Sequence, residues 1–248
     1  MQARNRNGSH HPLTRLLATA SDYTWYANNL LGVRLTSRVF STSSQAVPAI
    51  ARARIILFPG IYETPRYFQS ITTMLTSWGA HVIPLHLGRM RAPVPFLAQR
   101  ALDELADIPS DLPIIFLAHS KGSLVARAVL SQYPPAVHGL IALAAPWNGS
   151  TLARFFPSHA HLARLAPGGL DTYIPWTDAR ETRLRSRIYS IAPQWDPHIP
   201  QGSFLSGAHN ITLGRSGHFR PLGDRQLPHI IARCLNELIA CAPLTDCD

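Results

Sequence analysis

The sequence predicts an α/β protein with a mostly parallel central sheet of about six strands flanked by helices. From residue 54 onward, strand-sized apolar runs alternate with helix-length amphipathic segments, which is the pattern of strands joined by crossover helices. The apolar run at 113–118 is nearly continuous, as in a strand buried on both faces of a parallel sheet. The chain has 248 residues, 46% of them hydrophobic, which suits one domain with one sizeable core. We therefore expect a single domain over residues 1–248.

Each element follows from a short apolar run or an amphipathic segment bounded by turn residues. The expected strands cover residues 54–58, 81–86, 113–118, 138–144, 186–192 and 208–213. The expected helices cover residues 65–78, 94–106, 122–132 and 227–240. Gly79 should end the first of these helices.

Two segments lie outside this alternation. Residues 1–50 form an N-terminal extension without a clear strand, in which 13–31 could form one or two short helices. Residues 147–186 are rich in Pro, Gly, Arg and aromatic residues and show no strong period. A segment of this length without regular structure usually carries a lid or a substrate wall, so we expect a lid- or cap-like excursion.

The charge of the chain is strongly positive, at +9 from 23 basic and 14 acidic residues. Lys121 is the only lysine, and the arginines are scattered, with no block of five or more and no interleaved aromatic motif. Nucleic-acid binding is therefore not predicted. A positive field does allow peripheral contact with anionic lipid.

Segments that would direct the chain to a membrane or an oxidising compartment are not evident. No run approaches the roughly 18 apolar residues of a membrane-spanning helix. The apolar tract at 16–20 is short and is followed at once by Ser21 and Asp22, which makes a poor signal peptide. Cys234, Cys241 and Cys247 match no common zinc pattern. We expect a cytoplasmic protein with reduced thiols and no metal.

The segment 118–122, Ala-His-Ser-Lys-Gly, lies between a buried strand and a helix, where a nucleophilic serine is carried on a sharp turn. That turn demands small residues two positions before and after the serine, and Ala118 and Gly122 meet the demand around Ser120. The turn also directs the first amides of the helix toward a reacting carbonyl. An ordinary serine N-cap is the alternative interpretation. The pentapeptide alone does not decide between them.

A serine nucleophile needs a histidine to take its proton and an acid to orient that histidine, and after such a turn the chain order is Ser, acid, His. His218 follows the last expected strand in a glycine-containing turn, where the carboxyl end of the sheet would bring it over Ser120. Asp196 follows the preceding strand, and Pro197 holds it in an extended conformation. We expect His218 to be the base and Asp196 the acid.

Other residues of the same types are weaker candidates. Asp224 follows His218 and so breaks the order, while Asp171 and Asp178 lie in the excursion. If His218 were not the base, His209 and His198 would be the next histidines to test.

A tetrahedral intermediate needs two N–H donors, and two loops can supply them. The amide of Lys121, one residue after the serine, supplies the first. The second is expected from the loop after the first strand, where Gly60 permits a turn; Ile61 is favoured and Tyr62 is next. The side chain of Lys121 is expected on the surface.

With these residues in place, the chain resembles the bacterial triacylglycerol lipase and esterase branch of the α/β-hydrolases. The similar segments are 55–60, 117–127, 143–150 and 196–218, which occur in the right order and together span most of the chain. The resemblance implies the α/β-hydrolase fold and an acyl-enzyme mechanism. Three positions depart from the pattern: Pro59 replaces the usual His, Lys121 the usual Met or Gln, and Ser123 the usual second Gly.

The sequence thus predicts a serine hydrolase that cleaves a small ester or acyl substrate without a cofactor. Tyr62, beside the oxyanion loop, and Trp147, at the start of the excursion, are the expected substrate-binding residues, although the aromatic residues after Pro146 could equally pack on the sheet. Two alternatives stay open: an acyltransferase that uses the same three residues, and a catalytically silent module of this fold that binds lipid or protein.

Overall fold

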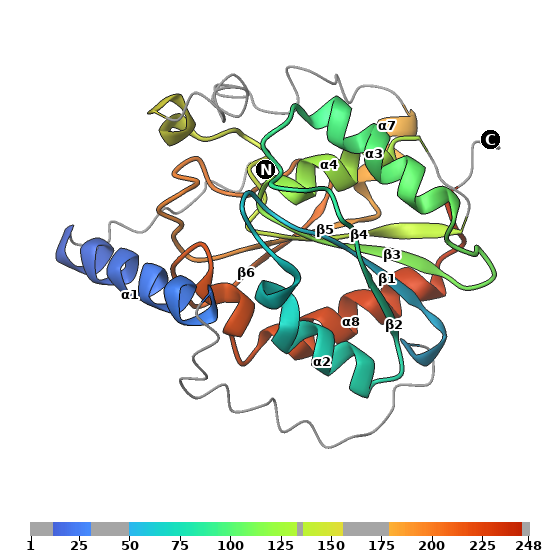
Figure 1. Ribbon diagram of the computed structural model, residues 1–248, viewed down its shortest axis with the longest axis horizontal. Helices are drawn as coiled ribbons and strands as arrows, with labels where there is room; N and C mark the ends of the chain where they lie inside the picture. Colours follow the sequence, from blue (N-terminus) through green and yellow to red (C-terminus); the bar gives the residue numbers. More distant parts are fainter. Residues whose placement is uncertain (1–11, 31–49, 133–135, 156–178, 245–248) are drawn as a thin grey trace.

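The structure, a computed structural model, describes residues 12–30, 50–132, 136–155 and 179–244. Its centre is one sheet of six strands in the order β2-β1-β3-β4-β5-β6, and every neighbouring pair is parallel (Figure 1). The strands are β1 (Arg54–Phe58), β2 (His81–Pro84), β3 (Ile114–His119), β4 (Val137–Leu143), β5 (Ile188–Ala192) and β6 (His209–Thr212). The predicted fold class is confirmed, because all six expected strands are present within a few residues of their expected ends.

Helices cover both faces of the sheet, as the alternation in the sequence requires (Figure 1). One face packs on α3 (Val94–Ala106), α4 (Lys121–Leu130) and α7 (Ala179–Arg185) through side chains such as Phe58 and Phe116. The other face packs on α2 (Gln69–Ser77) and α8 (Leu227–Ala240) through side chains such as Ile55 and Leu117. Successive residues of a strand thus point into opposite cores, which explains why the central strands are apolar throughout.

Some boundaries differ from the sequence-based expectations for identifiable reasons. The expected helix 65–78 divides into a 3-10 turn, η2 (Pro65–Phe68), and α2, while β2 ends at Pro84 instead of residue 86. Proline has no N–H to donate, so it suits the end of an edge strand. Helix α7, at the end of the 147–186 excursion, was not expected, and the lid-like part between residues 156 and 178 lies outside the described residues.

In the described part of the N-terminal extension, residues 12–30, the chain forms one continuous helix, α1 (Pro12–Leu30), where the sequence predicts one or two short helices. It extends from the body beside η2 and a second 3-10 turn, η5 (Arg220–Gly223) (Figure 1). Its partly buried Trp25 and Tyr26 pack against the core on the α2 and α8 side of the sheet. Among the described residues, no helix combines the length and the apolar character needed to cross a membrane.

Candidate active site

Ser120 occupies the turn between β3 and α4 with a backbone conformation that L-residues rarely adopt, φ 52° and ψ −130°. The turn brings the start of α4 against the end of β1. A Cβ added at Gly122 would lie 2.3 Å from the carbonyl oxygen of Phe58 and 2.4 Å from that of Pro59, so only glycine fits there. Ala118 is fully buried. The requirement for a small residue two positions after the serine thus has a direct steric cause.

The structure brings Ser120, His218 and Asp196 together in one chain of hydrogen bonds. His218 Nε2 lies 2.9 Å from Ser120 Oγ, and His218 Nδ1 lies 2.7 Å from Asp196 Oδ2. The other carboxylate oxygen of Asp196 accepts the backbone N–H groups of His198 and Ile199 at 2.7 and 3.1 Å. These two amides fix the carboxylate, and the carboxylate in turn fixes the ring of His218.

The electrostatics of this group suit a neutral histidine beside an ionised carboxylate at neutral pH. Burial lowers the pKa of His218 well below its ordinary value of 6.5, and the positive charge of His119 lowers it further. Burial raises the pKa of Asp196 to about 6, against the opposing hydrogen bonds from the backbone of His198 and Ile199. His218 is therefore available to accept a proton from Ser120.

The rival acids and bases have other partners. Asp224 accepts the N–H of Gln226 at 2.8 Å and pairs with Arg215 at 3.4 Å, so it belongs to the turn between η5 and α8. His209 lies on β6, stacked on Tyr189, with Nε2 3.1 Å from the carbonyl oxygen of Ser186. Asp171 and Asp178 lie outside the described residues.

His198 contributes to the site in a way that the sequence did not indicate. Its ring stacks on that of His218, with centroids 4.6 Å apart and planes 14° apart. Burial lowers the pKa of His198 to about 4, with a further lowering from the neighbouring His218, so it is neutral at pH 7. The neutral ring of His198 packs against one face of the His218 ring.

The two expected oxyanion donors belong to different segments, the start of α4 and the loop after β1. Lys121 is the first residue of α4, where backbone N–H groups have no acceptor within the helix. In the loop after β1, the N–H of Tyr62 donates to the carbonyl of Arg89 at 3.2 Å and is therefore engaged. Ile61 stays the better donor of the two residues considered. The loop is also strained, since Tyr62 has φ 60°.

The expectation of an exposed Lys121 side chain is wrong. This side chain is fully buried, and Nζ donates to the carbonyl oxygens of Met90 at 2.8 Å and Ala92 at 2.6 Å. It thereby ties the segment after β2 to the residue that follows Ser120. Burial lowers the pKa of Lys121 to about 8.

A second buried pair, Glu63 with His119, lies directly behind the site. His119 Nδ1 contacts Glu63 Oε1, His119 Nε2 lies 3.0 Å from the carbonyl oxygen of His218, and Glu63 Oε2 accepts the N–H of Gly60 at 2.6 Å. Burial alone would raise the pKa of Glu63 and lower that of His119, but their mutual attraction reverses both shifts. Their mutual attraction thus favours the charged form of both groups, and the pair links the oxyanion loop, the serine turn and the His218 loop.

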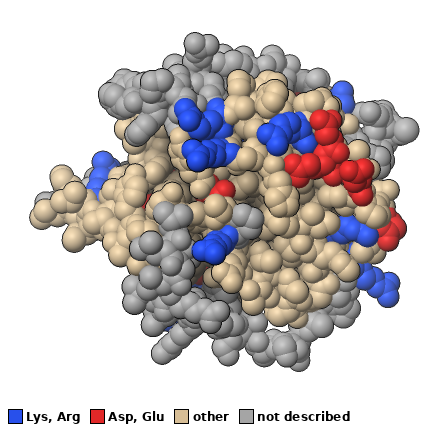
Figure 2. Space-filling view, viewed as in Figure 1, with Lys and Arg blue, Asp and Glu red and all other residues tan. Residues whose placement is uncertain are grey.

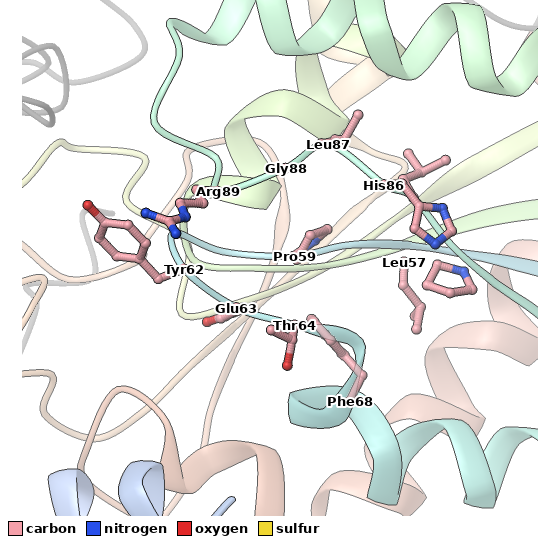
Figure 3. Close-up of a pocket in the computed structure, with 12 residues that line it drawn as sticks. Leu57, Pro59, Tyr62, Glu63, Thr64, Phe68, His86, Leu87, Gly88 and Arg89 are labelled. Carbon is pink, nitrogen blue, oxygen red and sulfur yellow. The ribbon is translucent and has the colours of Figure 1, made fainter. Parts of the chain in front are cut away.

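A cavity of about 420 Å³ lies on the β2 side of the oxyanion loop (Figure 3). Its walls are mainly apolar, and Tyr62 and Arg89 lie at one end of it, with His86 at the other (Figure 3). Ser120 is not among its lining residues, so the serine hydroxyl does not form part of the cavity wall. Tyr62 is 42% exposed and is placed where a bound group could contact it.

Trp147, the other expected substrate-binding residue, is fully buried. Its indole N–H donates to Ser190 Oγ at 2.8 Å, and its ring belongs to the core on the α3 and α4 side of the sheet. This placement supports the packing alternative and argues against direct contact with a substrate.

The described residues contain no group of three or more His, Cys, Asp or Glu side chains that could hold a metal ion. Cys234 and Cys241 are free thiols, and Cys247 lies outside the described residues. The Lys and Arg side chains visible on one face lie in separate groups and form no continuous basic patch there (Figure 2).

Comparisons with known proteins agree on the fold. No protein-family model matches the chain, and no curated protein matches it. Solved structures do match: a metagenomic carboxyl esterase has a TM-score of 0.57 at 16% identity and covers 75% of this chain and 76% of its own. A pyrethroid hydrolase has a TM-score of 0.53 at 16% identity, over 76% of this chain and 99% of its own. The mature Bacillus licheniformis lipase has a TM-score of 0.52 at 16% identity, over 74% of this chain and 92% of its own.

At 16% sequence identity, these structural similarities establish the fold alone. The chain has the α/β-hydrolase fold, as the sequence predicts.

Proposed function

We propose that the protein is a serine hydrolase that cleaves carboxylic esters through an acyl-enzyme on Ser120. The observation that carries the proposal is the hydrogen-bonded chain from Ser120 Oγ through the ring of His218 to Asp196, at 2.9 and 2.7 Å. It lies at the carboxyl edge of the parallel sheet, on a strained turn at the end of β3. This is the arrangement that activates a serine hydroxyl.

In the proposed mechanism, Ser120 Oγ attacks the ester carbonyl while His218 Nε2 takes the hydroxyl proton. Asp196 stabilises the positive charge that His218 then carries. The amides of Lys121 and Ile61 hold the negative oxygen of the tetrahedral intermediate, and each such donor typically contributes about 3 kcal/mol. Collapse breaks the bond to the alcohol, which leaves with the proton from His218. Water then attacks the acyl-enzyme by the same steps and releases the carboxylic acid.

The cavity beside the oxyanion loop supports a substrate with an apolar group. Its volume of about 420 Å³ lies in the lower part of the usual range for small-molecule sites. Leu57, Phe68, Leu85 and Leu87 contribute to its walls, and Tyr62 stands at its exposed end. The structurally similar proteins described above are an esterase, a pyrethroid hydrolase and a lipase by name, which is consistent with ester chemistry on this fold.

The test is hydrolysis of chromogenic esters with acyl chains from short to long. Wild type should cleave at least one of them, while Ser120→Ala and His218→Ala should both lose the activity. Matched controls are Ser131→Ala, at the other end of α4, and His209→Ala, on β6; both should retain it. Activity that persists in Ser120→Ala would refute the proposal.

Two further outcomes would each point to one of the alternatives. Acyl transfer that occurs only with an added alcohol acceptor would identify an acyltransferase. No reaction at any chain length, with or without an acceptor, would favour the silent binding module.

A further inference from the structure

The carboxylate of Asp22, on the inner face of α1, is completely buried against the loop that carries His218. Its Oδ2 accepts the backbone N–H of His218 at 2.8 Å, and its Oδ1 accepts those of Phe219 and Arg220 at 2.8 and 2.9 Å. One side chain from the N-terminal extension thus binds three consecutive amides of a loop that lies almost 200 residues later in the chain.

The contact between Asp22 and the loop requires a glycine at the neighbouring position, Gly217. Gly217 has φ +121°, and a Cβ added there would lie 2.5 Å from Asp22 Oδ1. Any other residue at this position would therefore displace the carboxylate as well as strain the backbone. The loop leaves just enough room for Asp22.

The remaining contacts of His218 show what Asp22 adds. Asp196 and Ser120 bind the two ring nitrogens, His198 stacks on the ring, and His119 approaches the backbone carbonyl. The N–H of Gly217 donates to the carbonyl oxygen of Trp195 at 2.8 Å, and the carboxylate of Asp22 accepts the next three N–H groups. Without Asp22, residues 218–220 lose this restraint on their N–H groups.

Helix α1 is held in place by residues other than Asp22. The ring of Tyr26 lies 4.6 Å from that of Phe219 and 5.1 Å from that of Tyr67, centroid to centroid. Trp25 packs over the backbone of Gly223, where an added Cβ would lie 3.1 Å from its Nε1. A conservative change at Asp22 should therefore leave the helix docked.

We infer that Asp22 is a positioning residue for His218: by binding the amides of residues 218–220 it keeps the imidazole aligned between Ser120 and Asp196. The inference rests on the proposed function and deepens it, because it gives α1 a role in positioning His218. Asp22 touches neither substrate nor the reacting atoms: it holds the His218 loop, and its negative charge also raises the pKa of His218 against the lowering by burial.

The test replaces Asp22 by asparagine, which has the same shape but only one accepting oxygen. At least one of the three amides then loses its acceptor. A misplacement of a catalytic group by about 1 Å can cost about 100-fold in rate, so kcat of Asp22→Asn should fall roughly 10- to 100-fold with KM little changed. Asp22→Glu keeps the charge but displaces it by one methylene, and its kcat should fall in the same way.

Two readouts report on the loop without relying on turnover. Hydrogen exchange at the amides of 218–220 should be faster in Asp22→Asn than in wild type. The low-field NMR signal of the proton between His218 Nδ1 and Asp196 should shift or disappear. The matched control is Asp224→Asn, at another buried aspartate that accepts a backbone N–H, that of Gln226; it should lower stability and leave kcat and the low-field signal unchanged.

The outcomes separate this inference from the proposed function. Faster exchange at 218–220 with kcat within twofold of wild type, or with an unchanged low-field signal, would overturn the positioning role and leave the hydrolase proposal intact. If wild type cleaves no ester, the proposed function fails. In that case the low-field signal alone decides the role of Asp22: a shift or loss of the signal in Asp22→Asn supports the inference, and an unchanged signal overturns it.

Discussion

Replacing Glu63 by glutamine should destabilise the protein strongly, because it removes the charge from a fully buried ion pair. The side chains of Glu63 and His119 are 1% and 0% exposed. Removing one partner of such a pair typically costs about 3–5 kcal/mol. Glutamine preserves the shape, but its one accepting oxygen can bind either the His119 ring or the Gly60 N–H. We therefore expect the free energy of unfolding to fall by about 3 kcal/mol, near the lower end of that range. In a domain of this size that corresponds to a fall in Tm of about 6–12 °C.

The pH dependence of this loss follows from the two pKa shifts. The pKa of Glu63 lies below its ordinary 4.5, so its stabilisation is present above that pH and is lost as pH falls through the folded pKa. The pKa of His119 lies above its ordinary 6.5, so its stabilisation is complete below that pH and is lost as pH rises through the folded pKa. The stability difference between wild type and Glu63→Gln should therefore be largest between pH 4.5 and 6.5.

Thermal and urea unfolding of both proteins across this pH range measure the effect. The control is Glu104→Gln, a partly exposed carboxylate that accepts one backbone N–H, from His86, at 2.9 Å. That change should alter stability by no more than about 0.5 kcal/mol. A loss below about 1 kcal/mol in Glu63→Gln, or one that is constant with pH, would refute the buried ion pair.

Three further predictions concern the proposed reaction. Asp196→Asn should lower kcat by about four orders of magnitude by favouring the wrong His218 tautomer, and steady-state kinetics showing less than a tenfold effect would move the acid role elsewhere. Because the pKa of His218 is lowered by burial and by His119, the acid limb of kcat/KM should have its midpoint below pH 6.5; a midpoint above pH 7 would contradict this. Thr64→Trp should fill the cavity and shift the preference toward shorter acyl chains, with Thr73→Trp on α2 as control; an unchanged chain-length profile would show that the acyl group binds elsewhere.

The parts of the fold that repeat a simple physical pattern could be predicted from the sequence. Buried parallel strands must be apolar on both sides, so β3 and β4 stand out as continuous apolar runs. The serine turn is predictable because its crowding requires small residues at fixed positions, as the contact of Gly122 with β1 shows. The proximity of Ser120, Asp196 and His218 could be predicted for a different reason. Each of them follows a strand of the parallel sheet, and the carboxyl ends of these strands lie at one edge of the sheet.

The supporting residues could not be predicted, because nothing local distinguishes them. Asp22 lies in a helix that has no pattern linking it to residue 218, and in the sequence it only counts against a signal peptide. Glu63 and His119 form a pair across 56 residues, and each alone is an ordinary polar residue beside a turn. Lys121 was expected on the surface because lysine is rarely buried, whereas the two carbonyl acceptors that bury it lie in a different loop.

Labelling with a fluorophosphonate tests whether His218 activates Ser120 as a nucleophile. Attack by Ser120 Oγ forms an O–P bond and releases fluoride, and peptide mass spectrometry then locates the label. We expect one label per chain on the peptide that contains Ser120, with labelling greatly slowed in His218→Ala and unchanged in His209→Ala. A label on another residue, or equal labelling rates in His218→Ala and wild type, would contradict it.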